Sequence, residues 1–556
     1  MIIANTYVLA IIMNNDIGCV MKKNNFIQGA FIATFGIVMT KIIGILYVIP
    51  FYQIIGDKGG ALYGYAYNIY NIFLNISYAG IPIAMSKITS EYNALGLYED
   101  KKQAFKIGIK IALILSVISF LILFIFAPFI SYLIIGNVDG GNTREEIALV
   151  IRIISTAILI VPVLSIYRGY FQGHKYIKPT SISQIIEQIF RVIVILGGSY
   201  LALKVFNLSL TTAVGISVFG ATIGALFSFM YILKKYYDNE QEFEDSGNKK
   251  RTISDKDIFK QIIIYSIPLV LIDLSKTLYS SIDVMTLVKT LVNGIGYNVT
   301  DAESIMSVIS TWGLKLNMII TSIGTGIVIS LVPSLSENYA INENKEINNK
   351  INKSLQILLF FTLPMTVGLS MLSKPVWSVF YGFNELNSTT FSYSIFIALF
   401  LGLFMTAVTT VQILKDYKYV IICLISGLIT KIVLNIPLIY LFDKLGMPAH
   451  FGSITATIIG YAVPFAISLI HLKNKYKINY QETTKKTLHI IIGTTLMACS
   501  IIFIKLFIPI YSQSRFANIG IVVIYTIIGL STYLFYTWKV GLINEMFGNK
   551  LKKIKK

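Results

Sequence analysis

Charged residues are scarce in this sequence of 556 residues. They make up only 13% of the chain, whereas apolar residues account for 55% and the mean hydropathy is +0.70. A soluble globular protein carries about 25% charged residues, so this deficit excludes a water-soluble enzyme, a disordered protein and a coiled coil. The apolar residues suffice for roughly fourteen spans of ~20 residues each, which indicates an all-α polytopic membrane protein.

Cysteine and histidine are also rare. The three cysteines, Cys19, Cys423 and Cys499, stand far apart, and the four histidines are scattered. These spacings indicate neither a disulfide framework nor a metal site, and we expect no cofactor. No Gly-Lys dipeptide occurs, which excludes a P-loop and nucleotide hydrolysis by that route. A membrane glycosyl- or acyltransferase would need a cluster of carboxylates or histidines at one membrane face, and the sequence contains none.

Positive charge exceeds negative charge by 19. In a soluble protein this excess would suggest a nucleic-acid partner, but membrane proteins collect basic residues in their cytoplasmic loops. With the N-terminus inside, the predicted cytoplasmic loops and tails hold 29 Lys and Arg residues and the external loops hold four. We therefore predict a cell-membrane protein with both termini in the cytoplasm and no nucleic-acid partner. The basic tail Lys550–Lys556 is expected to lie on anionic lipid headgroups.

Fourteen apolar spans can be placed along the chain. They cover approximately 26–52, 62–88, 105–134, 147–171, 181–204, 211–235, 260–290, 304–333, 354–380, 391–414, 419–442, 452–472, 488–510 and 518–540. A polar segment near mid-chain separates two groups of six spans. The predicted parts are an N-terminal extension (1–25), an N-lobe (26–235), a cytoplasmic linker (236–258), a C-lobe (259–472), helices 13 and 14 (488–540) and a basic cytoplasmic tail (541–556). Met21 offers an alternative start of translation, and we assign residues 1–20 no function.

The two halves carry an internal repeat. Four pairs of residues recur 240 to 246 positions apart: Gly80 and Gly326, Gly136 and Gly382, Gln172 and Gln412, and Arg191 and Lys431. Both copies begin after an even number of spans, so the repeat is parallel and the two lobes are expected to be pseudo-symmetric. Transporters built in this way bind their substrate between the halves and alternate access by rocking them.

Three lysines fall in the middle of predicted spans: Lys41 in the first, Lys276 in the seventh and Lys315 in the eighth. A charge near the bilayer centre is costly, so it should face a cavity or a partner. Spans 1 and 7 are equivalent in the two halves, and their lysines can therefore meet across one central cavity. Ammonium groups there would bind the phosphate oxygens of an anionic substrate. The alternative for Lys276 is an ion pair with Asp273, three residues earlier.

Asp283 has no oppositely charged partner at helical spacing. It could bind a coupling cation, accept a proton, or pair with a cavity lysine, and a counter-ion role toward Lys41 or Lys315 is the simplest of these. Neutral residues of spans 11 and 12 could complete an oxygen-lined ion site with it. These residues are Asn435, Thr455 and Thr457. A coupling ion at this site would be Na⁺ or H⁺.

Other polar groups in the spans have simpler expected roles. Glu187 and Arg191 lie four residues apart and are expected to neutralise each other. Arg168 is expected to anchor its span at the interface, and Lys431 has no identifiable partner. The tyrosines of Tyr63–Tyr70 are expected in an interface belt or in the core, with stacking against a sugar as the alternative.

Several sequence blocks carry a family resemblance. They are Lys41–Phe51 (KIIGILYVIPF), Ala61–Tyr70 (ALYGYAYNIY), Gly80–Lys87 (GIPIAMSK), Tyr167–Gly173 (YRGYFQG), Lys178–Arg191 (KPTSISQIIEQIFR) and Ser330–Ser334 (SLVPS). From Phe26 onward, the chain resembles the Gram-positive lineage of MurJ-type flippases in the MOP (MATE-like) exporter superfamily, near the stage V sporulation protein B relatives. The resemblance implies fourteen helices in two lobes, a lipid-tail groove formed by helices 13 and 14, and the flipping of lipid II for cell-wall synthesis.

The resemblance also carries over to individual residues. Lys41 matches a basic position of helix 1, and Lys315 falls within about one residue of a basic position of helix 8. Both positions belong to the family's cationic cavity. Gram-negative members carry further cavity arginines where Tyr47 and the Leu74–Asn75 region stand here. The cavity is therefore expected to be less basic than in those members.

Together these features predict a monomeric transporter, not an enzyme, that flips lipid II from the inner to the outer leaflet by alternating access. Its partners would be lipid II or a similar polyprenyl-linked glycan, together with membrane lipids. The first alternative is a flippase for another polyprenyl-pyrophosphate-linked glycan. The second is a MATE-type cation or drug antiporter, which the mid-span lysines disfavour because a cationic substrate calls for an acidic cavity.

Overall fold

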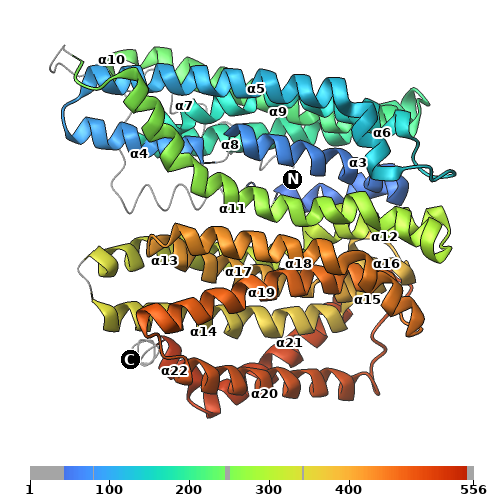
Figure 1. Cartoon of the computed structure of the whole chain (residues 1–556). Coiled ribbons are helices and arrows are strands. Elements are labelled where there is room, and N and C mark those ends of the chain that lie inside the picture. The colour runs from blue at the N-terminus through green and yellow to red at the C-terminus, as the bar shows by residue number, and fades with distance from the viewer. Residues whose placement is uncertain (1–39, 41–42, 79, 244–250, 341–342, 548–556) are drawn as a thin grey trace.

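The computed structural model describes residues 40, 43–78, 80–243, 251–340 and 343–547, which form helices joined by short turns (Figure 1). The first part of this chain contains α3 (Val48–Tyr78), α4 (Ile81–Ala94), α5 (Tyr98–Ile135), α6 (Arg144–Ser155), η1 (Thr156–Leu159), α7 (Val161–Gly173), α8 (Ile177–Ile193), η2 (Val194–Gly198), η3 (Leu201–Val205), α9 (Leu210–Asp238) and α10 (Glu240–Phe243). The second part contains α11 (Asp255–Lys289), η4 (Thr290–Ile295), α12 (Val299–Ser307), η5 (Val308–Trp312), α13 (Gly313–Ala340), α14 (Asn344–Met371), α15 (Ser373–Tyr381), α16 (Glu385–Ser394), α17 (Phe396–Ile413), α18 (Tyr417–Lys444), α19 (His450–Tyr476), α20 (Gln481–Ile504), α21 (Arg515–Lys539) and α22 (Leu542–Phe547).

Eleven helical segments within the described residues are long and apolar enough to cross a membrane. Large apolar side chains are exposed along them, for example Ile125 of α5, Val433 of α18 and Phe535 of α21. Contiguous exposed apolar surface of this kind suits contact with lipid. The protein is therefore an all-α, polytopic membrane protein. Most of the predicted first span lies outside the described residues, and the total of fourteen spans stays a prediction.

The helices form two bundles with α11 running between them (Figure 1). We call α3–α10 the first bundle and α12–α22 the second bundle. Near the start of α11, Gln261 accepts a hydrogen bond from the Tyr92 hydroxyl of α4 at 2.7 Å. Near its end, Asp283 forms an ion pair with Lys431 of α18 at 2.6 Å. This helix, which the sequence analysis places in the C-lobe, thus contacts both bundles.

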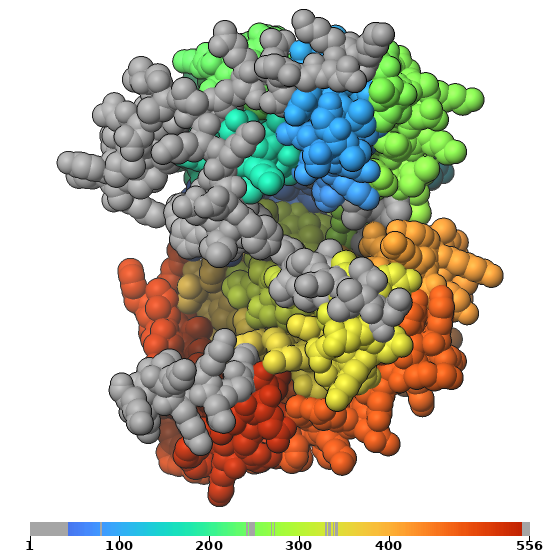
Figure 2. Space-filling view, turned by 90° about the vertical axis from the view of Figure 1, so that its left-hand side faces the viewer, coloured from blue at the N-terminus to red at the C-terminus, as the bar shows by residue number. Residues whose placement is uncertain are grey.

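The two bundles meet at one end of the molecule, which we call the closed end. The Asp57 carboxylate of the first bundle accepts hydrogen bonds from Ser304 Oγ and Asn387 Nδ2 of the second, each at 3.0 Å. Glu303 Oε1 accepts from the backbone N–H of Asn142 at 2.6 Å and from its side chain at 2.9 Å. These contacts lie where α6, α12 and α16 gather, on the right of Figure 1. Figure 2 looks at the opposite, open end, where the surface is hollowed between the bundles.

The internal repeat has a partial counterpart in the structure. Gly136 and Gly382 play the same part, since they end α5 and α15 with positive φ angles of 62° and 90°. Gly80 and Gly326 do not. Gly80, with φ 79°, precedes α4 and interrupts the predicted second span, whereas Gly326 lies inside the uninterrupted helix α13. The two halves therefore share the glycine that ends the third span and differ at the second span.

Small residues bring α3 against η5 beside the closed end. A Cβ on Gly60 would lie 2.2 Å from Trp312 Nε1, and a Cβ on Gly64 would lie 2.2 Å from Ser310 Oγ. The Thr311 hydroxyl donates to the Gly60 carbonyl at 2.8 Å. Trp312 is fully buried in this contact. The close approach of the two bundles therefore requires glycine on α3.

Replacing this glycine is expected to destabilise the protein. In Gly60→Ala the new methyl group must displace the buried Trp312 ring, and overpacking of this kind costs about 1–3 kcal/mol. The matched control is Gly197→Ala, because a Cβ there meets nothing within 4 Å. Thermal unfolding of the purified variants checks the prediction: Gly60→Ala should melt below Gly197→Ala, and equal melting temperatures would contradict the packing described.

Candidate functional site

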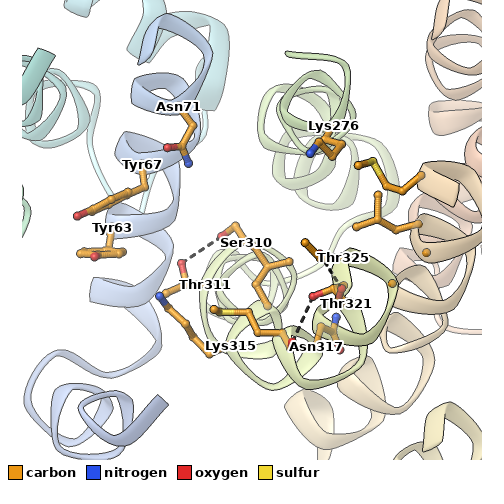
Figure 3. Close-up of a pocket in the computed structure, with 16 residues that line it drawn as sticks. Tyr63, Tyr67, Asn71, Lys276, Ser310, Thr311, Lys315, Asn317, Thr321 and Thr325 are labelled. Atoms are coloured by element: carbon orange, nitrogen blue, oxygen red, sulfur yellow. Dashed lines mark hydrogen bonds between the residues drawn. The ribbon is translucent and has the colours of Figure 1, made fainter. Parts of the chain in front are cut away.

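A cavity of about 460 Å³ lies between α3 of the first bundle and α11, η5, α13 and α17 (Figure 3). Its lining residues are Tyr63, Tyr67, Asn71, Lys276, Ser310, Thr311, Leu314, Lys315, Asn317, Met318, Thr321, Gly324, Thr325, Leu401, Gly402 and Met405. Among the described residues, this lining contains two lysines and no aspartate or glutamate. The cavity is therefore shared by both bundles, and the charge that its described lining residues carry is positive.

The two cavity lysines differ in their partners. Lys276 forms an ion pair with Asp273, one turn earlier in α11, and both side chains stay partly exposed, at 29% and 46%. The Lys315 ammonium lies 5.4 Å from the centroid of the Tyr47 ring, a cation–π contact. Figure 3 shows both ammonium groups turned toward the space between α3 and the second bundle. Lys276 is thus both paired and cavity-facing, whereas a ring and not a carboxylate faces Lys315.

Aromatic side chains of α3 form the wall opposite the lysines. The rings of Tyr63 and Tyr67 are stacked with centroids 4.4 Å apart, and both line the cavity. Tyr63 is buried in the hydrophobic core and Tyr67 packs against it, so the core position expected for these tyrosines is confirmed, and both also line the cavity. Lys41, the third lysine predicted for this cavity, lies outside the described residues.

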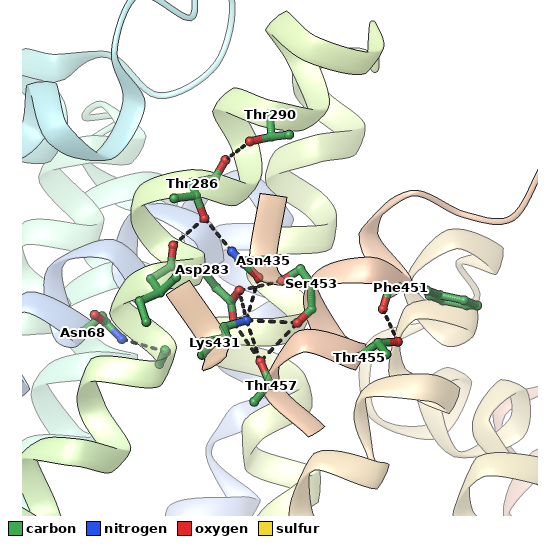
Figure 4. A network of polar contacts seen from close by, with 12 residues as sticks. Asn68, Asp283, Thr286, Thr290, Lys431, Asn435, Phe451, Ser453, Thr455 and Thr457 are labelled. Atoms are coloured by element: carbon green, nitrogen blue, oxygen red, sulfur yellow. Dashed lines mark hydrogen bonds and ion pairs between the residues drawn. The ribbon is translucent and has the colours of Figure 1, made fainter. Parts of the chain in front are cut away.

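Asp283 lies in a second polar cluster, about two helical turns beyond Lys276 along α11 (Figure 4). The Lys431 ammonium is 2.6 Å from Asp283 Oδ1, 2.7 Å from Thr457 Oγ1, 2.8 Å from Asn435 Oδ1 and 2.9 Å from the Ser453 carbonyl oxygen. The Lys431 side chain is 0% exposed and that of Asp283 is 4% exposed. We call these four oxygen-bearing residues the oxygen cage. It holds a buried, fully engaged ammonium group.

Tight helix packing one turn away aligns the members of the oxygen cage. The Tyr279 hydroxyl of α11 donates to the Gly460 carbonyl of α19 at 2.7 Å. A Cβ on Gly427 would lie 2.0 Å from that hydroxyl oxygen, so only glycine fits there on α18. Asp283 follows Tyr279 by four residues and Lys431 follows Gly427 by four, so each lies on the same helix face as the contact. The crossing of α11, α18 and α19 therefore brings the carboxylate to the ammonium.

The structure corrects two expectations about the charged residues. Asp283 is the counter-ion of Lys431 and not of Lys315, and Lys431, for which the sequence suggests no partner, has a carboxylate partner 148 residues away. The expected pairing of Asp283 with Lys41 involves a residue outside the described ones. Such a separation in sequence carries no periodic signal.

A third correction concerns Thr455. Its hydroxyl donates to the Phe451 carbonyl at 2.8 Å and is 2.8 Å from the Tyr393 hydroxyl, so it takes no part in the oxygen cage. Two positions along a helix correspond to a rotation of about 200°. Thr455 and Thr457 therefore point to opposite sides of α19, and only Thr457 faces Lys431.

The first bundle has its own charged cluster. Glu187 is paired with Arg191, as its spacing predicts, and also accepts a hydrogen bond from Arg168 Nη2 at 2.9 Å. Arg168 also donates to the hydroxyls of Ser183 and Ser228, each at 2.8 Å, and its side chain is only 13% exposed. Arg168 is therefore a buried member of this cluster and not an interface anchor.

The described residues contain no group of three or more His, Cys, Asp or Glu side chains that could hold a metal ion. The oxygen cage has one carboxylate, and an ammonium group occupies its centre. The charged residues of both polar clusters are therefore engaged in ion pairs within the protein.

Sequence comparison relates the chain to proteins of cell-envelope synthesis. Residues 26–339 match the family model described as "Polysaccharide biosynthesis protein". The chain is 32% identical over 541 residues to the lipid II flippase MurJ of Bacillus subtilis (strain 168), which covers 95% of this chain and 98% of that protein. It is 26% identical over 172 residues to stage V sporulation protein B of the same organism, covering 31% of this chain and 32% of that protein.

Solved structures share the fold. A structure of the lipid II flippase MurJ in an inward closed conformation superposes with a TM-score of 0.63 at 17% identity, covering 92% of this chain and 99% of that one. An inward-facing MATE family multidrug transporter of the MOP superfamily superposes with a TM-score of 0.62 at 13% identity, covering 80% and 99%. The fold is thus MATE-like, as the resemblance predicts. The chain belongs to the polysaccharide biosynthesis protein family and is a homologue of MurJ lipid II flippases, which are transporters and not enzymes.

Proposed function

We propose that this protein flips lipid II from the inner to the outer leaflet of the cell membrane by alternating access. The proposal rests on the cavity shared by the two bundles. Lys276 and Lys315 line it, and no aspartate or glutamate is among its described lining residues. Contacts between the bundles close the molecule at one end. The MurJ flippase of Bacillus subtilis, a relative over nearly the whole chain, supports lipid II as the substrate. Another polyprenyl-pyrophosphate-linked glycan is the second candidate, since it would present the same phosphate chemistry.

The phosphate groups would bind at the cavity lysines. Ammonium groups form strong, charge-assisted hydrogen bonds with phosphate oxygens. Among the described residues, Lys315 faces the Tyr47 ring and forms no ion pair. Lys276 can turn toward the phosphate because its partner Asp273 is half-exposed to solvent. Lys41 would complete the basic group. A cationic drug would meet repulsion here, so the cavity disfavours a MATE-type antiporter activity.

The lipid tail would stay in the bilayer, in a groove of α20 and α21. These helices pack beside α14 at the edge of the second bundle, where the Tyr533 hydroxyl of α21 donates to the Phe360 carbonyl at 2.8 Å. Rocking of the N-lobe (26–235) against the C-lobe (259–472) would then carry the headgroup across. The membrane potential or an ion gradient would supply the energy, and one chain holds the whole cavity, so a monomer suffices.

We further propose fourteen spans with both termini in the cytoplasm, so that the open end faces the cytoplasm. The last described helix, α22, lies at the open end in Figure 1. A surface pocket where α19 meets α20 is lined by Lys473 of α19, Lys477 of the connection and Lys485 of α20. Basic residues are enriched on the cytoplasmic side of membrane proteins. Lipid II made at the inner leaflet would then enter from the open end.

Complementation tests the proposed function. Cells depleted of their own lipid II flippase should regain growth when they express this protein, and lipid II should again become accessible at the outer surface. Absence of rescue with the protein inserted at normal level would contradict lipid II as substrate and favour the other lipid-linked glycan.

Loss of the Lys315 charge is expected to abolish rescue. A charge-assisted hydrogen bond is worth about 1.5–3 kcal/mol, so Lys315→Gln should reduce the flipping rate on the order of tenfold or more. Lys315→Arg keeps the charge and should have a milder effect. Lys41→Ala should reduce the flipping rate about as much as Lys315→Gln. Lys374→Gln is the matched control because this exposed lysine pairs with Glu385 far from the cavity lining. Rescue is measured at equal protein level, and full activity of Lys315→Gln would remove Lys315 from the site.

Weakening the closed end should expose the cavity to the outside. In Asp57→Ala with Glu303→Ala the interbundle acceptors disappear, and each charged hydrogen bond lost is worth about 1.5–3 kcal/mol. A cysteine placed at Thr321, in a Cys499→Ser background, should then react on the order of tenfold faster with an external, membrane-impermeant maleimide. A cysteine at the exposed Lys374 should react equally in both backgrounds. Unchanged labelling at position 321 would show that these contacts do not close the cavity.

A further inference from the structure

We propose that Lys431 is a tethered cation that occupies the oxygen cage in place of a free ion, so that this protein binds no Na⁺ at Asp283. The proposal goes beyond lipid flipping, because it holds whichever lipid-linked glycan is carried. It concerns whether a Na⁺ gradient can drive transport through binding of Na⁺ at Asp283.

The oxygen cage has the composition of a site for a hard cation. A carboxylate, a side-chain amide, a hydroxyl and a backbone carbonyl each point an oxygen at one position, from three helices (Figure 4). Hard cations take all-oxygen ligand sets of this kind. The atom at that position is Lys431 Nζ, which is 2.6 to 2.9 Å from all four oxygens.

The ammonium leaves no place for a second cation. An ammonium group has three protons and no lone pair, and here it has four oxygens within hydrogen-bond distance. The Asp283 oxygen that it contacts also accepts a hydrogen bond from the Ser453 hydroxyl at 2.5 Å. Asn435 is engaged on its other side, where its amide donates to Thr286 Oγ1 at 2.7 Å. A cation entering the cage would face a like charge at a few ångströms inside a buried site, where repulsion is poorly screened.

A tethered cation changes what holds α11 to the second bundle. With a free ion, the part of the contact between α11 and the helices α18 and α19 that passes through Asp283 would depend on whether the ion is bound. With Lys431 as the cation, the contact is part of the fold and independent of the ion concentration on either side of the membrane. Energy for transport would then enter by another route than Na⁺ binding at this cage.

The wild-type protein gives the first test. The melting temperature of purified protein is measured in NaCl and in choline chloride at equal ionic strength. We expect no Na⁺-specific shift. A Na⁺-specific rise in the melting temperature that Asp283→Asn abolishes would overturn the proposal, because it would place a free ion at Asp283. Neither reading depends on lipid II, so a failure of complementation leaves this test intact.

Removal of the tether gives the second test. Lys431→Ala leaves the four oxygens around an empty position, so this variant should gain a Na⁺-specific rise in melting temperature that saturates with NaCl, as ligand binding to the folded state does. Adding Thr457→Ala should reduce the rise, whereas Thr455→Ala, on the opposite side of α19, should leave it unchanged. A folded Lys431→Ala without any Na⁺ response would show that the cage is not a cation site.

The yield of folded Lys431→Ala protein in each salt is also informative. A Lys431→Ala protein that is recovered in NaCl but not in choline chloride supports the proposal, since the free ion then replaces the lost charge. If it is recovered in neither salt, the comparison of wild-type melting temperatures in NaCl and choline chloride, with its Asp283→Asn control, decides alone.

Discussion

A buried charge must find its counter-charge, and this constraint organises the helices of the protein. Asp283 and Lys431 are nearly inaccessible to solvent and 2.6 Å apart. Removing one member of such a pair leaves an uncompensated charge and costs about 3–5 kcal/mol. The pair therefore fixes α11 to the second bundle, while the Tyr92–Gln261 hydrogen bond fixes the other end of α11 to the first. Because α11 is tied to both bundles, any rocking of one against the other must bend or slide this helix. The first bundle satisfies the same constraint internally, with Glu187 shared by two arginines.

The positive charge of the cavity lining follows from the same constraint on buried charges. Carboxylates near the bundle interface do not line the cavity. Asp57 and Glu303 join the bundles at the closed end, Asp283 pairs with Lys431, and Asp273 pairs with Lys276. The lining is left with lysines, amides, hydroxyls and the stacked tyrosines of α3. A site of this composition favours an anionic headgroup, which is why the family membership and the geometry support the same proposal.

The sequence predicts those features that depend on composition and on short spacing. Apolar runs give the all-α membrane fold, and the three-residue and four-residue spacings give the Lys276–Asp273 and Glu187–Arg191 pairs. The helical period also separates Thr455 from Thr457, because two positions along a helix correspond to a rotation of about 200°. The partner of Lys431 could not be predicted, because it depends on how α11, α18 and α19 cross at Tyr279 and Gly427. Nor could the closed end, where Asn142 in a loop meets Glu303 of α12. Contacts between distant segments follow from packing and leave no periodic trace.

A flippase of this kind moves the lipid-linked headgroup across a bilayer without help from other proteins. The most direct measurement uses purified protein in liposomes that contain lipid II with a fluorescent headgroup, and an impermeant quencher added outside. We expect the protein to raise the fraction of quenchable headgroups above that in protein-free liposomes, and Lys315→Gln to slow this rise on the order of tenfold or more. An increase that is absent with wild-type protein would contradict flipping of lipid II by this protein, and an increase that is equally fast with Lys315→Gln would contradict binding of the headgroup at Lys315.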